Sequence, residues 1–485
     1  MAEPDPLADD RQLTRWLFLR LVGLVYVIAF GSLAVQVAGL IGPNGLQPAG
    51  SYLEWAHSSY GRSAYPLLPT VFWLGAGDIA LRLAAWVGVL LGLLVLAGVA
   101  SRAALAGAWL LYLSLSVAGQ DFLSFQWDAL LLETGVLAAL WAPPGWRPRR
   151  ELPAPSPLVR WLLVFLLFKL MFLSGATKLL SGDPTWRQLA ALDYHFETQP
   201  LPTWFGWYAH QLPSSLHRLQ TAIMFAIELG APWLLLVPDR LRRVRFAGLA
   251  ALIMLQAGIA LTGNYGFFNL LAVVLCVPAL DDRLLGRLIP LRLVSLPPGP
   301  TWRRTALATA VGPIAVLSTL SAWAELGVGP TVPRWGMAML GWVSPLRSFN
   351  GYGLFRVMTT ERPEIIMEAS LDGAHWQPYD LRYKPGPVSR APGFVEPYHP
   401  RLDWQLWFAA LDPMRGLPLL QALSARVRAE TPAVIALLGP APFRAAPRYI
   451  RFAYYDYRFT TWSERRKHGT WWVRELRGYL PNTAP

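Results

Sequence analysis

Charged side chains inside long apolar segments are the residues of this sequence whose chemistry stands out. Asp121, Asp128 and Glu133 lie at or within one such segment, and Lys169 and Lys178 lie in another. A charge inside a membrane is costly, so it normally pairs with another group or faces a wet cavity. We favour a buried clamp in which these acids pair with Lys169 or Lys178; the alternative is a proton-handling or substrate-handling site.

Helical spacing limits how these five side chains can combine. Asp121 and Asp128 share one face of a continuous helix, whereas Glu133 is about 140° away from Asp128, which argues against a carboxylate dyad. Lys169 and Lys178 are on nearly opposite faces of their helix, so they cannot form one cationic pocket unaided. We expect Lys178, near the end of its segment, to reach the interface and the deeper Lys169 to be salt-bridged.

Metal and hydrolase chemistry find little support. His195, Glu197 and His210 have spacings that a metal site could use, but the helix with two His and an acid that marks zinc hydrolases is missing. The sequence also contains no Gly-x-Ser-x-Gly, no His-Glu-x-x-His and no phosphate-binding Gly-rich loop. We therefore assign no catalytic residue, no metal and no cofactor, and expect a protein that is not an enzyme.

The elements that position these side chains are expected to be membrane helices. The chain is 54% hydrophobic and only 15% charged, against roughly 25% charged in soluble domains. Apolar segments long enough to cross a bilayer predict about nine spans. They are residues 17–41, 83–100, 103–119, 124–142, 158–180, 219–237, 246–263, 265–280 and 305–327.

One orientation places every Arg-rich short loop on the same side of the membrane. These loops contain Arg11 to Arg20, Arg102, Arg147 to Arg150, Arg240 to Arg245, and Arg283 to Arg304. Positive loops stay in the cytosol, so residues after 327 are expected on the non-cytosolic side. Contact with membrane lipids also explains the net charge of +13, and we expect no nucleic-acid partner.

The predicted fold class is an α-helical multi-pass membrane domain, residues 1–329, followed by a mixed α/β, β-rich extramembrane domain, residues 330–485. A turn at Asp372-Gly373 between 364–370 and 379–383 predicts a β-hairpin. The pattern further predicts a helix over 403–411 with Asp403 as its N-cap, helix over 417–438 and a strand over 449–459. The single cysteine, Cys276, excludes an internal disulfide.

Aromatic residues gather in three places outside the spans. Segment 181–213 contains Trp186, Tyr194, Trp204, Trp207 and Tyr208, which is typical of a re-entrant or surface helix at the membrane interface. Segments 350–364 and 398–411 combine Tyr, Trp, Phe and Arg. Those residue types build both small cores and partner surfaces, and the sequence leaves both possibilities open.

Several long blocks closely resemble the lipase maturation factor family. They run in one order from about residue 50 to the C-terminus, and strings of this length are far more specific than a short motif. The blocks are FLSFQWDALLLETG (122–135), SGATKLLSGDPTW (174–186), YHFETQPLP (194–202), WYAHQLP (207–213), TGNYGFFNLL (262–271), NGYGLFRVMTTERPEIIMEASLDGAHWQPYDLRYKPG (350–386), RLDWQLWFAAL (401–411) and GTWWVRELRGYLP (469–481).

The resemblance implies a multi-pass protein that helps dimeric lipases fold and assemble, with the C-terminal domain contacting the client. It implies the endoplasmic reticulum membrane in eukaryotes; in a bacterium the inner or plasma membrane takes its place. With Cys276 alone, no lumenal redox role carries over. The candidate client-binding or domain-defining residues are Asn350, Tyr352, Phe355, Arg401, Asp403, Trp404, Trp407, Trp471 and Trp472.

Two other functions remain open at this point. The first is a membrane enzyme that acts on a lipid or peptide in a pocket built from Asp128, Lys169 and segment 181–213. The second is a transporter, which is weakened because no inverted repeat is visible.

Overall fold

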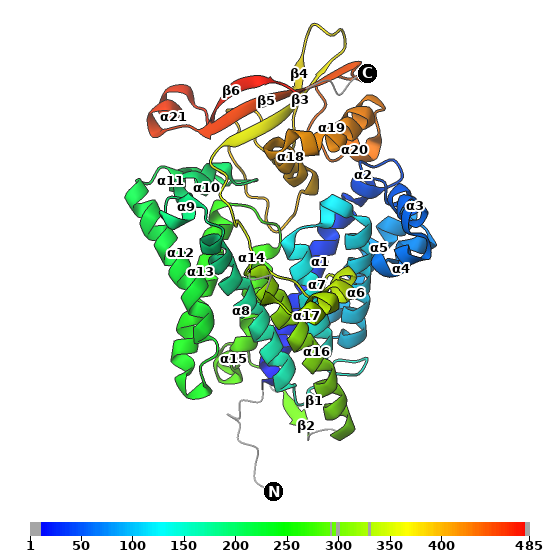
Figure 1. Ribbon diagram of the computed structural model, residues 1–485, viewed down its shortest axis with the longest axis vertical. Coiled ribbons are helices and arrows are strands. Elements are labelled where there is room, and N and C mark those ends of the chain that lie inside the picture. Colours follow the sequence, from blue (N-terminus) through cyan, green and yellow to red (C-terminus); the bar gives the residue numbers. More distant parts are fainter. Residues whose placement is uncertain (1–10, 292, 297–300, 328–330, 481–485) are drawn as a thin grey trace.

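A bundle of long helices carries a smaller part with a β-sheet at one of its ends (Figure 1). The structure is a computed structural model that describes residues 11–291, 293–296, 301–327 and 331–480. The predicted domain boundary between residues 329 and 330 lies outside the described residues.

Six helices among the described residues are long and apolar enough to cross a membrane. They are α1 (Gln12–Ala34), α5 (Asp78–Ala97), α6 (Ser101–Ala118), α8 (Pro157–Leu180), α13 (Arg242–Thr262, preceded by η4 at Asp239–Leu241) and α16 (Thr301–Glu325). The predicted hairpin of 83–100 and 103–119 is present as α5 and α6, with Gly98 ending α5 in the left-handed conformation at φ 79°.

The predicted count of nine spans is not confirmed. The helix in 124–142, α7 (Gln126–Trp141), has only 16 residues. The helix in 265–280 is also short, with α14 (Phe268–Cys276) followed by η5 (Val277–Ala279). The helix in 219–237, α12 (Ser214–Leu234), is long enough, but polar residues such as His217 and Glu228 make it less apolar.

Close helix packing depends on one small residue in particular. Gly23 of α1 lies against α5, where an added Cβ would come within 2.7 Å of the backbone nitrogen of Leu96. Any larger residue would therefore force α1 and α5 apart, as is common where small residues line a helix interface.

The basic loops meet at one end of the bundle, which we call the basic end. Arg11 and Arg245 both pair with Asp239, at 3.0 and 2.6 Å. Arg102 donates to the backbone oxygen of Ala142 at 2.6 Å. Strand β1 (Glu151–Pro153) pairs in parallel with β2 (Val294–Leu296) at this same end, at the bottom of Figure 1. Part of the predicted basic segment 283–304, namely residues 292 and 297–300, lies outside the described residues.

Short helices and the sheet occupy the opposite end, which we call the sheet end. Segment 181–213, predicted as an interfacial element, folds as three short helices beneath the sheet (Figure 1). The short elements at this end are α2 (Val37–Ile41), α3 (Ala49–Tyr60), η1 (Gly61–Ser63), α4 (Ala64–Leu67), η2 (Val71–Leu74), η3 (Gln120–Leu123), α9 (Pro184–Arg187), α10 (Leu192–Thr198) and α11 (Trp204–His210).

Residues after 331 build a four-stranded antiparallel sheet in the order β4-β3-β5-β6. One face of the sheet packs on α18, and Ile365, Met367 and Phe452 join the same hydrophobic core as the helical bundle. The elements are α17 (Arg334–Val343), η7 (Ser344–Leu346), β3 (Arg362–Ser370), β4 (Gln377–Tyr379), α18 (Arg401–Leu411), α19 (Pro413–Arg428), α20 (Pro432–Ile435), β5 (Tyr449–Phe459), α21 (Trp462–His468) and β6 (Trp472–Tyr479). Helix α15 (Asp282–Leu288) lies at the basic end.

The predicted hairpin, helix 403–411 and strand 449–459 are present, with three differences. Helix α18 begins at Arg401, so Asp403 is not its N-cap; the Asp403 carboxylate instead accepts from the backbone of Tyr383 and Lys384. Strand β4 ends at Tyr379, because Leu381 pairs with Leu438. The helix predicted over 417–438 breaks near Glu430, which has a φ of 47°.

Candidate functional site at the junction of bundle and sheet

A buried ion pair joins helix α18 to helix α7. The Arg401 guanidinium donates to both carboxylate oxygens of Asp128, at 2.9 and 2.8 Å. It also donates to the backbone oxygen of Phe122 at 2.6 Å, and Tyr112 donates to Asp128. Both members of the pair are 1% exposed. We call the contacts of residues 350–403 with the bundle the junction.

A second buried carboxylate on α7 collects groups from both parts of the chain. Glu133 accepts from Lys169 Nζ at 2.6 Å and from the Tyr352 hydroxyl at 2.7 Å. The backbone nitrogen of Asn350 donates at 3.3 Å to the same Glu133 oxygen, Oε2, as the Tyr352 hydroxyl, while Lys169 donates to Oε1. Glu133 thus binds a span and the start of the C-terminal part at once.

The predicted clamp is present in a different arrangement. Lys169 pairs with a carboxylate of α7, but Lys178 pairs with Glu228 of α12, with both oxygens 2.8 Å from its Nζ. The sequence did not single out Glu228, although a carboxylate in an apolar segment was the available signal. Asp121 does not share a helix face with Asp128, because the chain leaves η3 and starts a new helix at Gln126; Asp121 is exposed and accepts from Gln47 at 3.0 Å.

Most of the aromatic candidates of the C-terminal part belong to the core. Tyr352, Arg401, Asp403, Trp404, Trp407 and Trp472 are buried. Asn350, Phe355 and Trp471 are half-buried. The buried side chains therefore do not form an exposed client surface. Trp404 instead packs on Trp127 of α7, with ring centroids 4.9 Å apart, and Trp472 packs on Phe459 of the sheet, 4.4 Å away.

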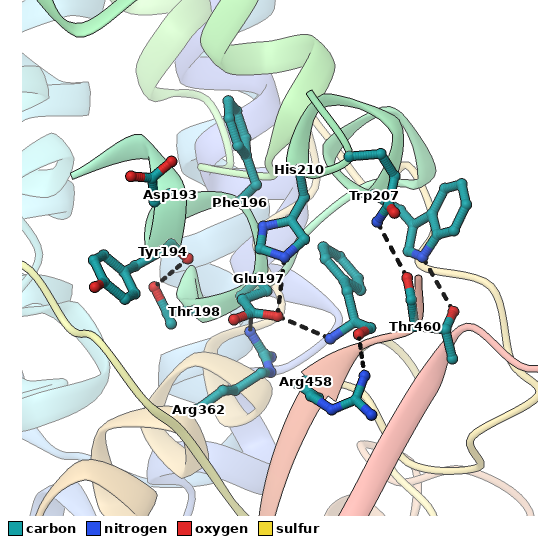
Figure 2. Close-up of polar contacts among 12 residues, drawn as sticks. Asp193, Tyr194, Phe196, Glu197, Thr198, Trp207, His210, Arg362, Arg458 and Thr460 are labelled. Atoms are coloured by element: carbon teal, nitrogen blue, oxygen red, sulfur yellow. Dashed lines mark hydrogen bonds and ion pairs between the residues drawn. The ribbon is translucent and has the colours of Figure 1, made fainter. Parts of the chain in front are cut away.

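Helices α10 and α11 form a further set of contacts with the sheet (Figure 2). The Glu197 carboxylate accepts from the backbone nitrogen of Phe459 at 2.9 Å and lies 3.5 Å from His210 Nε2. Trp207 Nε1 donates to the Thr460 hydroxyl at 3.3 Å. Burial raises the pKa of Glu197 and lowers that of His210 to about 4. His210 is therefore neutral at pH 7.

The three residues with metal-like spacing do not converge. His195 faces Phe355 and Tyr265 rather than Glu197 and His210; its ring centroid is 5.1 Å from that of Phe355. Within the described part of the chain, no group of three or more His, Cys, Asp or Glu could hold a metal ion.

Two cavities meet at the junction. The first, of about 670 Å³, lies between α7, segment 354–359 and helices α18 and α19. The second, of about 460 Å³, lies between α8, α12 and α13 and is mostly apolar. Trp127, Tyr265, Leu354 and Phe355 line both cavities. Asp128 and Lys169 line neither, so the pocket considered for a membrane enzyme is not built from them.

Phe355 holds an unusual backbone conformation between the two cavities. Its φ is 53°, in the left-handed region that a bulky residue rarely adopts. Its backbone oxygen accepts from Trp186 Nε1 at 3.0 Å, and its ring packs on Tyr265. Such strain persists only where the surroundings hold it, and it is common at functional sites.

Asn264 and Glu396 fasten a loop of the C-terminal part onto the sheet end. Asn264 accepts from the backbone nitrogens of Val395 and Glu396, at 2.7 and 3.1 Å. The Glu396 carboxylate accepts from Asn269 Nδ2 at 3.0 Å and from the backbone nitrogen of Tyr265. Neither Asn264 nor Glu396 stands out in the sequence, because each polar group finds its partner only in the fold.

Comparison with known proteins gives one consistent result. The family model described as Lipase maturation factor transmembrane domain matches residues 13–287, and the one described as Lipase maturation factor C-terminal domain matches residues 348–481. No solved structure matches the chain.

Full-length relatives carry the same name. The chain is 35% identical to Lipase maturation factor 2 of Rattus norvegicus, over 96% of this chain and 82% of that protein. It is 34% identical to Lipase maturation factor 2 of Homo sapiens, over 98% and 83%. It is 33% identical to Lipase maturation factor 1 of Mus musculus, over 97% and 87%. Together with the six apolar helices, these matches indicate an integral membrane protein.

Removing one member of the Arg401–Asp128 pair tests how strongly the junction is held. We expect Arg401→Met to lower the free energy of unfolding by about 3–5 kcal/mol, because Asp128 remains charged and buried. As a control, Arg82→Gln breaks the exposed Asp78–Arg82 pair, and we expect a loss of about 0–1 kcal/mol. Denaturation of both purified variants in the same detergent makes the comparison.

A double variant separates the pair from the packing around it. Asp128→Leu/Arg401→Met leaves no unpaired charge, so it should be more stable than Arg401→Met alone. If the Arg401→Met variant is as stable as Arg82→Gln, the Arg401–Asp128 pair does not hold the two parts of the protein together.

The Glu396 contact predicts a pH dependence. Burial raises the pKa of Glu396 to about 7, above the roughly 4.3 of a free Glu. The folded state therefore binds this proton more tightly than the unfolded chain does. The stabilisation that comes from protonated Glu396 is complete below about pH 4 and is lost as the pH rises to about 7. Thermal unfolding at pH 5 and pH 8 measures it.

Glu396→Gln should reduce this pH dependence, whereas Glu54→Gln, on exposed α3, should leave it unchanged. Part of the dependence should remain, since burial also raises the pKa of Asp403 to about 6. An identical pH dependence in wild type and Glu396→Gln contradicts the prediction.

Proposed function

Because the chain belongs to the lipase maturation factor family, we propose that it assists the folding or assembly of secreted proteins, with lipases as clients, through its C-terminal part. The family membership confirms the resemblance found in the sequence. The clients and the part of the protein that meets them are proposals.

An exposed cluster on the sheet is the observation that supports this proposal. Arg451 stacks between the rings of Trp376 and Tyr479, at 4.1 and 4.3 Å from the centroids. Next to it, Arg474 lies 4.6 Å over the ring of Tyr455. We call these five residues the arginine–aromatic cluster. They lie on β5, β6 and the β3–β4 turn, away from the helical bundle (Figure 1).

The composition of this cluster fits protein recognition. Tyr, Trp and Arg are enriched among the residues that dominate binding energy at interfaces. Tyr479 is 49% exposed and the Arg451 side chain 33% exposed, so a partner can reach both. The stacked guanidiniums are already ordered, which lowers the entropy cost of binding. The buried aromatics of the junction lack this accessibility.

A further support is the edge of the sheet. Strand β6 is the last strand of the order β4-β3-β5-β6, and it is exposed along most of its length. Its outer edge can pair with an extended segment of a partly folded client. Arg474 and Glu475 on this strand discourage unspecific strand pairing.

The two ends of the bundle suggest the orientation. The basic end gathers the Arg-rich loops, so we place it in the cytosol, and the C-terminal part then faces the non-cytosolic compartment where secreted lipases fold. This is the endoplasmic reticulum lumen in a eukaryotic cell and the outside of the inner or plasma membrane in a bacterium.

A non-catalytic role fits the buried charges. The family is named for maturation rather than for a reaction. The intramembrane charges first considered for chemistry, Asp128 and Lys169, are each paired outside both cavities.

Single-cysteine labelling tests the orientation. The sole cysteine, Cys276, is buried, so wild type supplies the blank. We expect a membrane-impermeant thiol reagent applied to the non-cytosolic face to label Ser463→Cys on α21 but not Arg149→Cys at the basic end. Labelling of both positions from the same face contradicts the orientation.

Lipase activity per unit of lipase protein tests the function. We expect cells that lack this protein to secrete a lipase of lower specific activity, because the lipase fails to assemble rather than to be synthesised. Arg451→Glu/Arg474→Glu should reproduce the defect and weaken client capture by at least about tenfold.

Lys467→Glu is the matched control. It reverses an exposed charge on α21, outside the arginine–aromatic cluster, and should leave lipase activity unchanged. The cluster is not the client surface if the double variant is present at normal levels and supports full lipase specific activity. Unchanged specific activity in cells without the protein contradicts the function itself.

A further inference from the structure

The cavity between α8, α12 and α13 is separate from the arginine–aromatic cluster, and exposed side chains of α12 and α13 line its rim. Its volume of about 460 Å³ falls within the roughly 300–1,000 Å³ of small-molecule sites. Ile223 of α12 and Met254 of α13 line it and are 50% and 65% exposed. Helices α12 and α13 stand at the outer edge of the bundle (Figure 1). A lipid chain can therefore enter from the membrane between them.

Two buried polar atoms at this cavity have no hydrogen-bond partner. Gln256 is 3% exposed; its Nε2 contacts the sulfur of Met171 at 3.6 Å, and its Oε1 is unpartnered. His195 Nδ1 is buried and also unpartnered. Unpaired buried polar atoms are rare because each costs free energy, so they point to a missing partner.

Both unpartnered atoms are hydrogen-bond acceptors. The Tyr265 hydroxyl donates its one proton to Gln199 at 2.8 Å. Toward His195 Nε2, which lies 3.4 Å away, this hydroxyl can therefore act only as an acceptor. That contact keeps the His195 proton on Nε2 and leaves Nδ1 as an acceptor. Gln256 Oε1 is an acceptor by nature. The missing partner must therefore donate hydrogen bonds, as a hydroxyl does.

The charges in the cavity are balanced. Lys178 and Glu228 both line it, and they are paired with each other at 2.8 Å. Lys178 also lies 5.4 Å over the ring of Trp186. A carboxylate or phosphate entering this site would find no uncompensated cation, and burying an unpaired charge is costly. A neutral ligand meets no such penalty.

We propose that this cavity binds a neutral lipid with two free hydroxyl groups, such as a monoacylglycerol. The acyl chain fills the apolar space between α12 and α13, while one hydroxyl group donates to Gln256 Oε1 and the other donates to His195 Nδ1. This site does not depend on the proposed client role. Phe355 and Tyr265, which line both cavities, separate the bound lipid from the larger cavity under α18.

Photolabelling of the full chain in lipid nanodiscs tests the proposal. The probe is a monoacylglycerol with a diazirine in its acyl chain. Two matched probes carry the same chain, one ending in a fatty-acid carboxylate and one with every hydroxyl replaced by a methyl ether. We expect the monoacylglycerol probe to label peptides from residues 214–262, and the other two to label them roughly tenfold less.

Two glycines offer a matched pair of blocking variants. Gly258 lines the cavity, and an added Cβ there meets no atom within 4 Å, so Gly258→Phe narrows the opening without a backbone clash. Gly230 on neighbouring α12 has the same open surroundings but does not line the cavity. We expect labelling to fall by about tenfold in Gly258→Phe and to stay unchanged in Gly230→Phe.

Gln256→Leu tests the polar end of the site. It keeps the size of the side chain and removes the acceptor, so we expect roughly threefold to tenfold weaker labelling, as one lost hydrogen bond produces. Equal labelling of wild type and Gly258→Phe would overturn the site. Stronger labelling by the fatty-acid or ether probe would overturn the ligand class. Both outcomes are read from photolabelling alone, so they are independent of the lipase activity that tests the proposed function.

Discussion

Two carboxylates on one short helix set the relation between the two parts of this protein. Helix α7 buries both Asp128 and Glu133, and an unpaired charge in such surroundings costs several kcal/mol. Each carboxylate is compensated by a group from after residue 345, Arg401 for the first and Tyr352 for the second, with Lys169 adding a cation from α8. The C-terminal part therefore completes the interior of the bundle and cannot separate without leaving Asp128 unpaired and removing the Tyr352 hydrogen bond from Glu133.

The same constraint divides the aromatic residues between two roles. Because Tyr352 and Arg401 reach α7, the neighbouring Trp404 is drawn inward, where it packs on Trp127. On the sheet, by contrast, Trp376, Tyr455 and Tyr479 stack with arginines. The surface that we propose for the client thus lies on the sheet, apart from the junction.

Dense packing at the junction also leaves two spaces unfilled. Helix α12 is tied to α8 through Lys178 and Glu228, and helix α13 contacts α8 through Gln256 and Met171, with an apolar cavity between the three helices. Above it, residues 354–355 close the space toward α18, with Phe355 held in a left-handed conformation by Trp186. A rigid junction and a preformed lipid-sized cavity therefore have a common cause.

Local patterns in the sequence reveal the helical membrane region, the Arg-rich loops that share one end, a β-hairpin that turns at Asp372-Gly373, strand β5 and the family. Hydropathy, charge and turn residues act locally, and long blocks in one order are specific to a family. The sequence predicts that the buried charges pair, but it does not reveal which residues are the partners. Only the fold shows that Asp128 pairs with Arg401 and that Lys178 pairs with Glu228. Partners 273 and 50 residues apart leave no trace in local pattern. The same holds for burial: Trp407 on α18 and Tyr479 on β6 are alike as aromatic residues, and only the packing of α18 against the bundle hides the first and leaves the second exposed.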